Sequence, residues 1–271
     1  MEYRLLALDM DGTVLTSKKV ISPRTEAAIH EALAKGKEVL FATGRCPAEM
    51  RGYFETFPDM KYVMCISGAL ILNIQTGETL TDIAMPRPMV ELLLKTAKAL
   101  NVMTSVSAGP HVFVERRHRG NMEHFNCQCF AALYDDCATW VDDAEEILDT
   151  FGDRVYKINY YCPNDEVWQK AAGILKNLPL SCASGIPLDL EITAEGVNKG
   201  MGLETLSRVT GISLSEMIAV GDEGNDLEMI QTAGLGVAMG NAADEVIAAA
   251  DVMTADCDHD GVAEVIKHCL L

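Results

Sequence analysis

Short apolar runs alternate with segments of helical periodicity near the start of the chain, and this alternation constrains the fold more than any other feature. Residues 3–10, 37–43 and 61–67 have the composition of buried strands. The segment between the first two begins with Ser22-Pro23, a helix N-cap and first-turn pair, and ends near Gly36. The repeated order of strand, helix and strand predicts a parallel sheet with right-handed crossovers.

The same alternation returns from residue 199 to the C-terminus, whereas the middle of the chain differs. Between about 86 and 187 the apolar runs alternate as in antiparallel strands, with helical patterns between them. We therefore predict an α/β fold: a Rossmann-like core with a mainly parallel sheet flanked by helices, plus an inserted α+β domain. The expected ranges are 1–84 and 189–271 for the core and 85–188 for the inserted domain.

Composition limits the partners of such a protein. The 22 Lys and Arg against 40 Asp and Glu give a formal charge of -18, which disfavours nucleic acid and anionic membrane surfaces. No apolar run approaches the about 18 residues of a membrane span. The nine cysteines have no framework spacing and are expected to be reduced thiols. We expect a cytoplasmic protein without membrane or nucleic-acid partners, and its oligomeric state stays open.

Two polar segments follow the first and second predicted strands. Asp9 and Asp11 end the first strand, and residues i and i+2 of an extended chain point to the same side. The pair could bind a ligand beyond the carboxyl ends of the strands, or could be a turn or N-cap pair. Thr43 and Gly44 end the second strand, with a hydroxyl and an accessible N–H that suit a phosphate oxygen or an ordinary polar loop.

Two further polar segments lie in the C-terminal part. Lys199 falls in the first turn of a predicted helix, where a cation opposes the helix dipole unless an anion is near. Asp222, Asn225 and Asp226 follow a predicted strand, and such a group favours a hard cation with oxygen ligands. A helix N-terminus explains Asn225 and Asp226 but leaves Asp222 unexplained.

All four segments are predicted at one edge of one sheet. Carboxylates, a cation site, a lysine and a hydroxyl in one place favour phosphoryl transfer through an aspartyl-phosphate. Both a phosphate monoester and a carboxylate nucleophile are anions, so Mg²⁺ and the lysine are needed to offset their repulsion. The residue pattern does not decide which aspartate attacks.

The four segments resemble, in order and spacing, the motifs of the haloacid dehalogenase-like phosphatases: DMDGT, FATGR, NKG and GDEGND. The large insertion between the second and third motifs is similar to the C2-type cap of the Cof-like branch. The resemblance implies that this cap closes over the site and that Mg²⁺ is the cofactor. It also implies a small phosphorylated molecule as substrate.

The resemblance also implies roles for individual residues. Asp9 would be the nucleophile, and Asp11 the acid that protonates the leaving oxygen and then the base that activates water. Mg²⁺ would be held by the Asp9 carboxylate, the Asp11 main-chain carbonyl and Asp222, with Asp226 supporting these ligands from outside. The phosphate would be held by Met10, Thr43, Gly44, Lys199 and Asn225.

The substrate entrance is where the chain departs from the family. The resemblance places Arg45, Ser67 and Gly68 at this entrance. Relatives usually carry Asn-Gly-Ala where this chain has Ser67-Gly68-Ala69, so a shorter hydroxyl replaces an amide near the substrate.

Three other patterns point to structure rather than to binding. The stretch 256–261 imitates the start of a calcium loop, but the twelfth position is Lys267, so we expect a helix N-terminal turn. The histidines and cysteines of the inserted domain lack zinc-site spacing; they are His118, His124, Cys127 and Cys129. The basic run Arg116–Arg119 is expected at a solvated strand end, with a second anionic group of the substrate as the alternative.

The sequence therefore predicts a Mg²⁺-dependent phosphatase of a small-molecule phosphomonoester, a sugar phosphate or similar metabolite. Two other functions use related chemistry. A phosphomutase would form the same aspartyl-phosphate and return the group to a sugar. A non-enzymatic phospho-aspartate signalling module would be far shorter than 271 residues.

Overall fold

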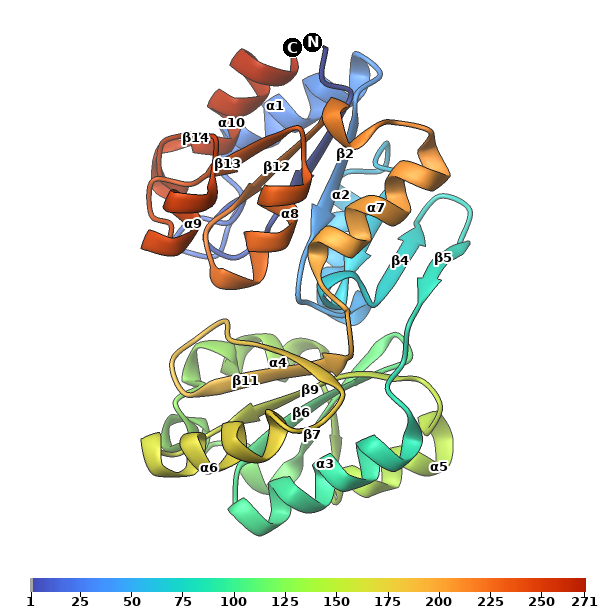
Figure 1. Cartoon of the computed structure of the whole chain (residues 1–271), viewed down its shortest axis with the longest axis vertical. Helices are drawn as coiled ribbons and strands as arrows, with labels where there is room; N and C mark the ends of the chain where they lie inside the picture. Colours follow the sequence, from blue (N-terminus) through green and yellow to red (C-terminus); the bar gives the residue numbers. More distant parts are fainter. Residues whose placement is uncertain (1) are drawn as a thin grey trace. The chain divides into compact units, whose positions relative to one another are not determined.

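The computed structural model describes residues 2–271, which divide into two compact units (Figure 1). The first unit holds the chain up to Gly44, together with Gly52–Asp82 and Asn198–Leu271. The second unit holds Arg45–Arg51 and Ile83–Val197. The chain thus leaves the first unit and returns to it twice, once for a short segment and once for a whole domain.

An eight-stranded sheet forms the first unit. Its strands are β1 (Leu5–Leu8), β2 (Glu38–Ala42), β3 (Tyr62–Cys65), β4 (Leu70–Asn73), β5 (Thr79–Asp82), β12 (Met217–Gly221), β13 (Leu235–Ala238) and β14 (Val252–Met253). The order is β14-β13-β12-β1-β2-β3-β4-β5. The first six are parallel, and β4 and β5 add antiparallel strands that the sequence analysis did not predict. The predicted Rossmann-like, mainly parallel sheet is confirmed.

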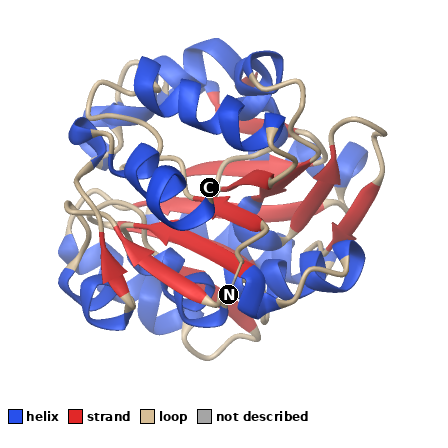
Figure 2. Cartoon of the chain, turned by 90° about the horizontal axis from the view of Figure 1, so that it is seen from above, coloured by secondary structure: helices blue, strands red, loops and turns tan. Residues whose placement is uncertain are grey.

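Helices flank this sheet, as a second view shows (Figure 2). They are α1 (Pro23–Ala34), α2 (Arg51–Thr56), α7 (Lys199–Thr210), α8 (Leu227–Thr232), α9 (Asp244–Ala249) and α10 (Gly261–Val265). The Ser22 side chain accepts a hydrogen bond from the Thr25 N–H and caps α1, as its sequence predicts. Residues 47–56 form a 3₁₀ turn, Pro47–Met50, followed directly by α2.

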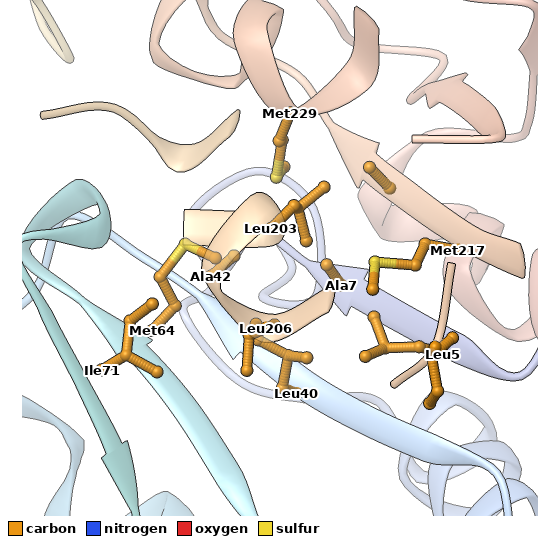
Figure 3. Close-up of a cluster of buried hydrophobic side chains, with 12 residues drawn as sticks. Leu5, Ala7, Leu40, Ala42, Met64, Ile71, Leu203, Leu206, Met217 and Met229 are labelled. Atoms are coloured by element: carbon orange, nitrogen blue, oxygen red, sulfur yellow. The ribbon is translucent and has the colours of Figure 1, made fainter. Parts of the chain in front are cut away.

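Buried side chains from β1, β2, β12 and α7 pack together on one face of the sheet (Figure 3). Leu5 and Ala7 lie two residues apart on β1 and therefore point to this same face. Leu203 and Leu206 of α7 pack against them, and each buried leucine contributes about 1.5–3 kcal/mol. This packing fixes α7 on the sheet and so places the start of the helix, Lys199, at the carboxyl edge.

The second unit contains a six-stranded, mostly antiparallel sheet of order β10-β11-β9-β6-β7-β8. Its strands are β6 (Met103–Ala108), β7 (His111–Glu115), β8 (Thr139–Val141), β9 (Val155–Tyr161), β10 (Leu180–Ala183) and β11 (Asp189–Ala194). Its helices are α3 (Arg87–Leu100), α4 (Ala131–Cys137), α5 (Ile147–Phe151) and α6 (Asp165–Leu175). The predicted α+β character of the insertion is confirmed.

The unit boundaries differ from the predicted ones. The first falls after Asp82, slightly earlier than predicted. The second falls after Val197, so residues 189–197, which were expected in the core, lie in the second unit, where β11 pairs with β9 and β10. The apolar alternation of β11 reports which residues are buried and not which sheet buries them, so the pattern could not decide.

The basic run that follows β7 makes contacts within the second unit. Arg116 donates to the Trp140 carbonyl at 2.8 Å, and Arg117 lies 2.7 Å from the Glu115 carboxylate. Arg119 lies over the Trp140 ring, 5.1 Å from its centroid. These arginines tie the turn after β7 to neighbouring residues, which favours the structural interpretation of the run.

Candidate active site

The ends of three neighbouring parallel strands meet at the carboxyl edge of the first sheet. Leu8 at the end of β1 pairs with Val220 of β12 on one side and with Phe41 of β2 on the other. Asp9, Asp222 and Thr43 follow these strands, as the sequence predicts. Ligands bind at this edge in open α/β sheets because the loops there diverge and leave room.

Lys199 joins this edge from the first turn of α7. The Asn198 side chain caps the helix by accepting a hydrogen bond from the Met201 N–H at 2.8 Å. The Lys199 side chain is 0% exposed, with its Nζ 2.5 Å from Asp9 Oδ1 and 2.6 Å from Asp226 Oδ1. The anion expected beside this lysine is therefore provided by two aspartates of the chain itself.

Both carboxylate oxygens of Asp226 accept hydrogen bonds within the first unit. Oδ1 contacts Lys199, and Oδ2 accepts hydrogen bonds from the Asp222 N–H at 2.9 Å and the Glu223 N–H at 3.2 Å. Asp226 therefore holds the loop after β12 and the lysine together.

Asp9, Asp222 and Asp226 form a buried acidic group. Carboxylate oxygens of the three lie within 4.8 Å of one another, and among residues 2–271 no other group of histidine, cysteine or acidic residues is placed to share an ion. Three carboxylates against the single ammonium of Lys199 leave two negative charges without an internal counter-charge.

The pKa values of these groups reflect their burial and the excess of carboxylates over positive charge. Burial raises the pKa of Asp222 to about 7, and the neighbouring Asp226 charge adds to the rise. Burial also raises the pKa of Asp9 well above its ordinary value, and the attraction of Lys199 only partly offsets this. For Lys199, burial lowers the pKa, but the charges of Asp226 and Asp9 outweigh burial and raise it. The lysine is therefore charged, while the acids need a further cation to ionise fully.

The residues fit a divalent metal ion. All the side-chain donors of the group are carboxylate oxygens, the ligands that Mg²⁺ prefers. Gly12 leaves the space that this arrangement needs: its φ is +91°, and a Cβ there would lie 2.1 Å from Asp222 Oδ2. Any side chain at this position would displace the Asp222 carboxylate from the acidic group.

Asp11 does not join the acidic group, contrary to the expectation that both aspartates point to one place. The chain turns after Asp9, with the Thr13 N–H donating to the Met10 carbonyl, so the extended i, i+2 relation ends there. The Asp11 carboxylate lies 2.8 Å from Lys19 Nζ, an ion pair at the surface. Such pairs are weak, so Asp11 can exchange this partner for another.

The loops after β2 and β3 meet beside Asp9. Thr43 is buried, and its carbonyl accepts a hydrogen bond from the Ser67 N–H at 2.9 Å. Ile66 and Ser67 have left-handed φ values of 51° and 52°, which is rare and costly for a β-branched residue. The buried Ser67 hydroxyl has no hydrogen-bond partner among the described residues.

The remaining predicted site residues are placed as follows. Met10 is buried, and Asn225 is half-buried in the 3₁₀ turn Gly224–Asp226. Gly68 has a φ of +100°, and a Cβ there would lie 2.6 Å from the Asn198 carbonyl. Arg45 belongs to the second unit and so is not among the residues that the first unit brings together.

Two residues beside the acidic group were missed. Thr13 and Asn241 donate hydrogen bonds to Asp222. Thr13 directly follows the aspartate pair, but Asn241 lies in a loop after β13 that carries no acidic or basic signal. The acidic stretch 256–261 forms the expected turn, capped by Asp256, before α10.

Comparison with known proteins identifies the family. A family model of haloacid dehalogenase-like hydrolases matches residues 6–266, so the chain belongs to that family. The chain is 28% identical to the 5-amino-6-(5-phospho-D-ribitylamino)uracil phosphatase YcsE of Bacillus subtilis, over 100% of this chain and 97% of that protein. It is 28% identical to the HMP-PP phosphatase of Yersinia enterocolitica, over 99% and 96%.

Solved structures agree with this assignment. A haloacid dehalogenase-like hydrolase from B. subtilis superposes with a TM-score of 0.89 at 26% identity, covering 98% of this chain and 99% of that one. Family and relatives together define the class of the protein as phosphoric monoester hydrolase. None of the described helices is long and apolar enough to cross a membrane.

Proposed function

We propose that this protein is a Mg²⁺-dependent phosphatase that hydrolyses a small phosphomonoester through an aspartyl-phosphate on Asp9. The observation that carries the proposal is the acidic group at the sheet edge, in which Asp9 contacts Lys199 and two buried negative charges lack a counter-charge. A divalent cation and the phosphoryl group of a substrate complete such a site.

Asp9 is the proposed nucleophile. A carboxylate oxygen of Asp9 forms a bond to phosphorus while the bond from phosphorus to the leaving oxygen breaks. Lys199 favours the ionised form of Asp9 and offsets the charge of the phosphoryl oxygens. We assign Thr43, Gly44 and Asn225, with Met10, to the phosphate as well, because they lie in the loops that follow β1, β2 and β12.

Asp11 is the proposed acid and base. It gives a proton to the leaving oxygen in the first step and takes one from the attacking water in the second. The water oxygen then bonds to phosphorus, the bond to Asp9 breaks and inorganic phosphate leaves. Asp11 is partly exposed, and its ion pair with Lys19 lies at the surface, where such pairs are weak enough to be exchanged for a contact with a substrate.

The cation would be held by the carboxylates of Asp9 and Asp222 and by the main-chain carbonyl of Asp11. When bound, Mg²⁺ supplies positive charge that offsets the repulsion between the carboxylate nucleophile and the phosphate. Asp226 is assigned a supporting role because its oxygens already accept from Lys199 and two backbone N–H groups.

The substrate is proposed to be a small phosphorylated metabolite, since two relatives are named as phosphatases of such molecules. We assign Ser67 and Gly68 of the first unit to its entrance; the unpartnered Ser67 hydroxyl is free to bond to a substrate group. With a formal charge of -18, nucleic acid is not expected as a partner, and we propose a cytoplasmic location.

The test is hydrolysis of p-nitrophenyl phosphate by the full chain with Mg²⁺, comparing wild type with Asp9→Asn. We expect Asp9→Asn to lose at least about 1,000-fold in kcat, as for removal of a catalytic nucleophile. The exposed Asp59→Asn is the matched control and should keep wild-type activity. Activity of Asp9→Asn within a few-fold of wild type would contradict the proposal.

A further inference from the structure

Two side chains contact the two carboxylate oxygens of Asp222, one on each. Thr13 Oγ1 donates to Asp222 Oδ1 at 2.9 Å, and Thr13 is only 2% exposed. Asn241 Nδ2 lies 3.3 Å from Asp222 Oδ2 and donates to it. The orientation of this carboxylate is therefore set from both sides, by residues of the same unit.

The Asn241 amide also joins Asp222 to the loop after β1. Its Oδ1 accepts a hydrogen bond from the Cys257 N–H at 2.9 Å, so its nitrogen faces the acidic group. That nitrogen donates to the Gly12 carbonyl at 2.9 Å. Gly12 directly follows Asp11, whose carbonyl is a proposed metal ligand, so one amide holds the segments that carry two proposed ligands.

The main chain of Asp222 is held by the same loop. The Ala243 N–H donates to the Asp222 carbonyl at 2.9 Å, and the Met239 N–H donates to the Gly221 carbonyl at 3.0 Å. The loop that carries Asn241 thus fixes both the backbone and the side chain of Asp222. With its backbone fixed, the carboxylate can change its position only by side-chain rotation, which the two donors restrict.

We propose that Thr13 and Asn241 are positioning residues for the cation site: they hold Asp222 in the orientation that binds the metal. The proposal rests on the proposed function, which makes Asp222 a ligand. Partners outside the ligand shell orient metal-binding groups, and their loss typically lowers metal affinity about 10–100-fold. A residue that only stabilised the fold would change stability and leave metal affinity unchanged.

The Thr13 arm of the test uses an isosteric pair. Thr13→Val removes the hydroxyl and keeps the shape, and we expect the Kd for Mg²⁺, measured by titration calorimetry, to rise about 10-fold or more. Thr13→Ser restores the donor and should bind within about two-fold of wild type. Thr81→Val is the matched control, because Thr81 is also buried in the first unit and its hydroxyl has no partner among the described residues.

The second part of the test replaces Asn241. Because Asn241 is exposed, its replacement leaves the buried core intact. We expect Asn241→Ala to raise the Kd for Mg²⁺ less than Thr13→Val does, by several-fold, because water can replace part of an exposed hydrogen bond. Asn73→Ala is the control: it also removes an asparagine whose side chain bonds to backbone, at a turn remote from the acidic group.

Kinetics separate positioning from substrate binding. In both variants the Mg²⁺ concentration for half-maximal hydrolysis of p-nitrophenyl phosphate should rise with the Kd, while KM at saturating Mg²⁺ stays within about two-fold. Mg²⁺ affinity unchanged in both Thr13→Val and Asn241→Ala would overturn the inference, even if their melting temperatures fell. A wild-type protein without Mg²⁺ binding would instead contradict the proposed function itself.

Discussion

Asp222 in the first unit and Glu115 in the second are equally buried carboxylates, 5% and 4% exposed, with opposite electrostatic surroundings. Burial raises the pKa of Asp222 to about 7, with Asp226 adding to the rise. Burial acts in the same direction on Glu115, but His118 at 3.5 Å, together with the hydrogen bonds and the charge of Arg117, lowers its pKa to about 2. The two carboxylates therefore differ in how far neighbouring positive charge balances them, and not in how deeply they are buried.

The comparison distinguishes a structural acid from a binding site. Glu115 accepts from Arg117 at 2.7 Å and from the Ala144 N–H at 3.4 Å, so its charge is balanced within the second unit. Asp222 shares one lysine with two other aspartates, so its charge is only partly balanced and its pKa is raised. A buried acidic group that lacks its own counter-charge is the feature that points to function here.

The largest expected effect is on Lys199→Met. This change leaves three buried carboxylates without their only internal cation, and removal of one partner of a buried pair costs about 3–5 kcal/mol. Urea unfolding in EDTA should show that loss, together with loss of phosphatase activity in Mg²⁺. Arg117→Met is the control in the other region: Arg117 is half exposed, so its removal should cost less. Equal losses of unfolding free energy in Lys199→Met and Arg117→Met would contradict the proposed difference between the two regions.

The pH dependence of stability without metal should be the next largest effect. Because the folded pKa of Asp222 lies above the ordinary value of 3.8, the native state binds more protons than the unfolded state between pH 4 and about 7. The free energy of unfolding in EDTA should therefore fall as pH rises through this window, by up to about 1.4 kcal/mol for each unit by which the folded pKa is raised. Asp222→Asn should reduce the dependence of the unfolding free energy on pH. A wild-type stability that rises with pH over this range would contradict the raised pKa of Asp222.

Glu115→Gln should show the opposite and smaller pH dependence. The lowered pKa means that ionised Glu115 stabilises the protein above its ordinary pKa of 4.5, by about 1–2 kcal/mol for a charged hydrogen-bonded group. The stability difference between wild type and Glu115→Gln should be full above pH 5 and shrink as pH falls toward 2. Urea unfolding at several pH values measures it, and a pH-independent difference would show that Glu115 acts through packing alone.

The parts of the fold that local patterns determine could be predicted from the sequence. The parallel strands and the helix capped by Ser22 follow from apolar periodicity and turn chemistry. The pairing of β11 and the antiparallel β4 and β5 could not be predicted, because a strand's pattern does not name its partner. The left-handed Ile66 contradicts local preference and is imposed by its surroundings.

Some residues of the candidate site could likewise be predicted from the sequence, and others could not. Asp9, Thr43, Lys199 and Asp222 could be placed at one edge, because chemistry-bearing residues at strand ends of a parallel sheet meet there. The ion pair of Asp11 with Lys19 could not be predicted, because the chain turns after Asp9 and the extended relation between the two aspartates is lost. Asn241 gave no signal, since an asparagine in a loop is ordinary and only its contacts distinguish it.

The central claim is that the acidic group at the sheet edge has more negative charge than Lys199 alone can balance and binds a divalent cation. Mg²⁺ titrated calorimetrically into the metal-free protein near pH 7, in two buffers of different ionisation enthalpy, tests it directly. We predict one saturable site, protons released on binding because the pKa of Asp222 falls, and affinity that increases with pH. Asp222→Asn should lose the site and Glu115→Gln should keep it. No saturable binding to the wild type, or equal binding to Asp222→Asn, would contradict the account.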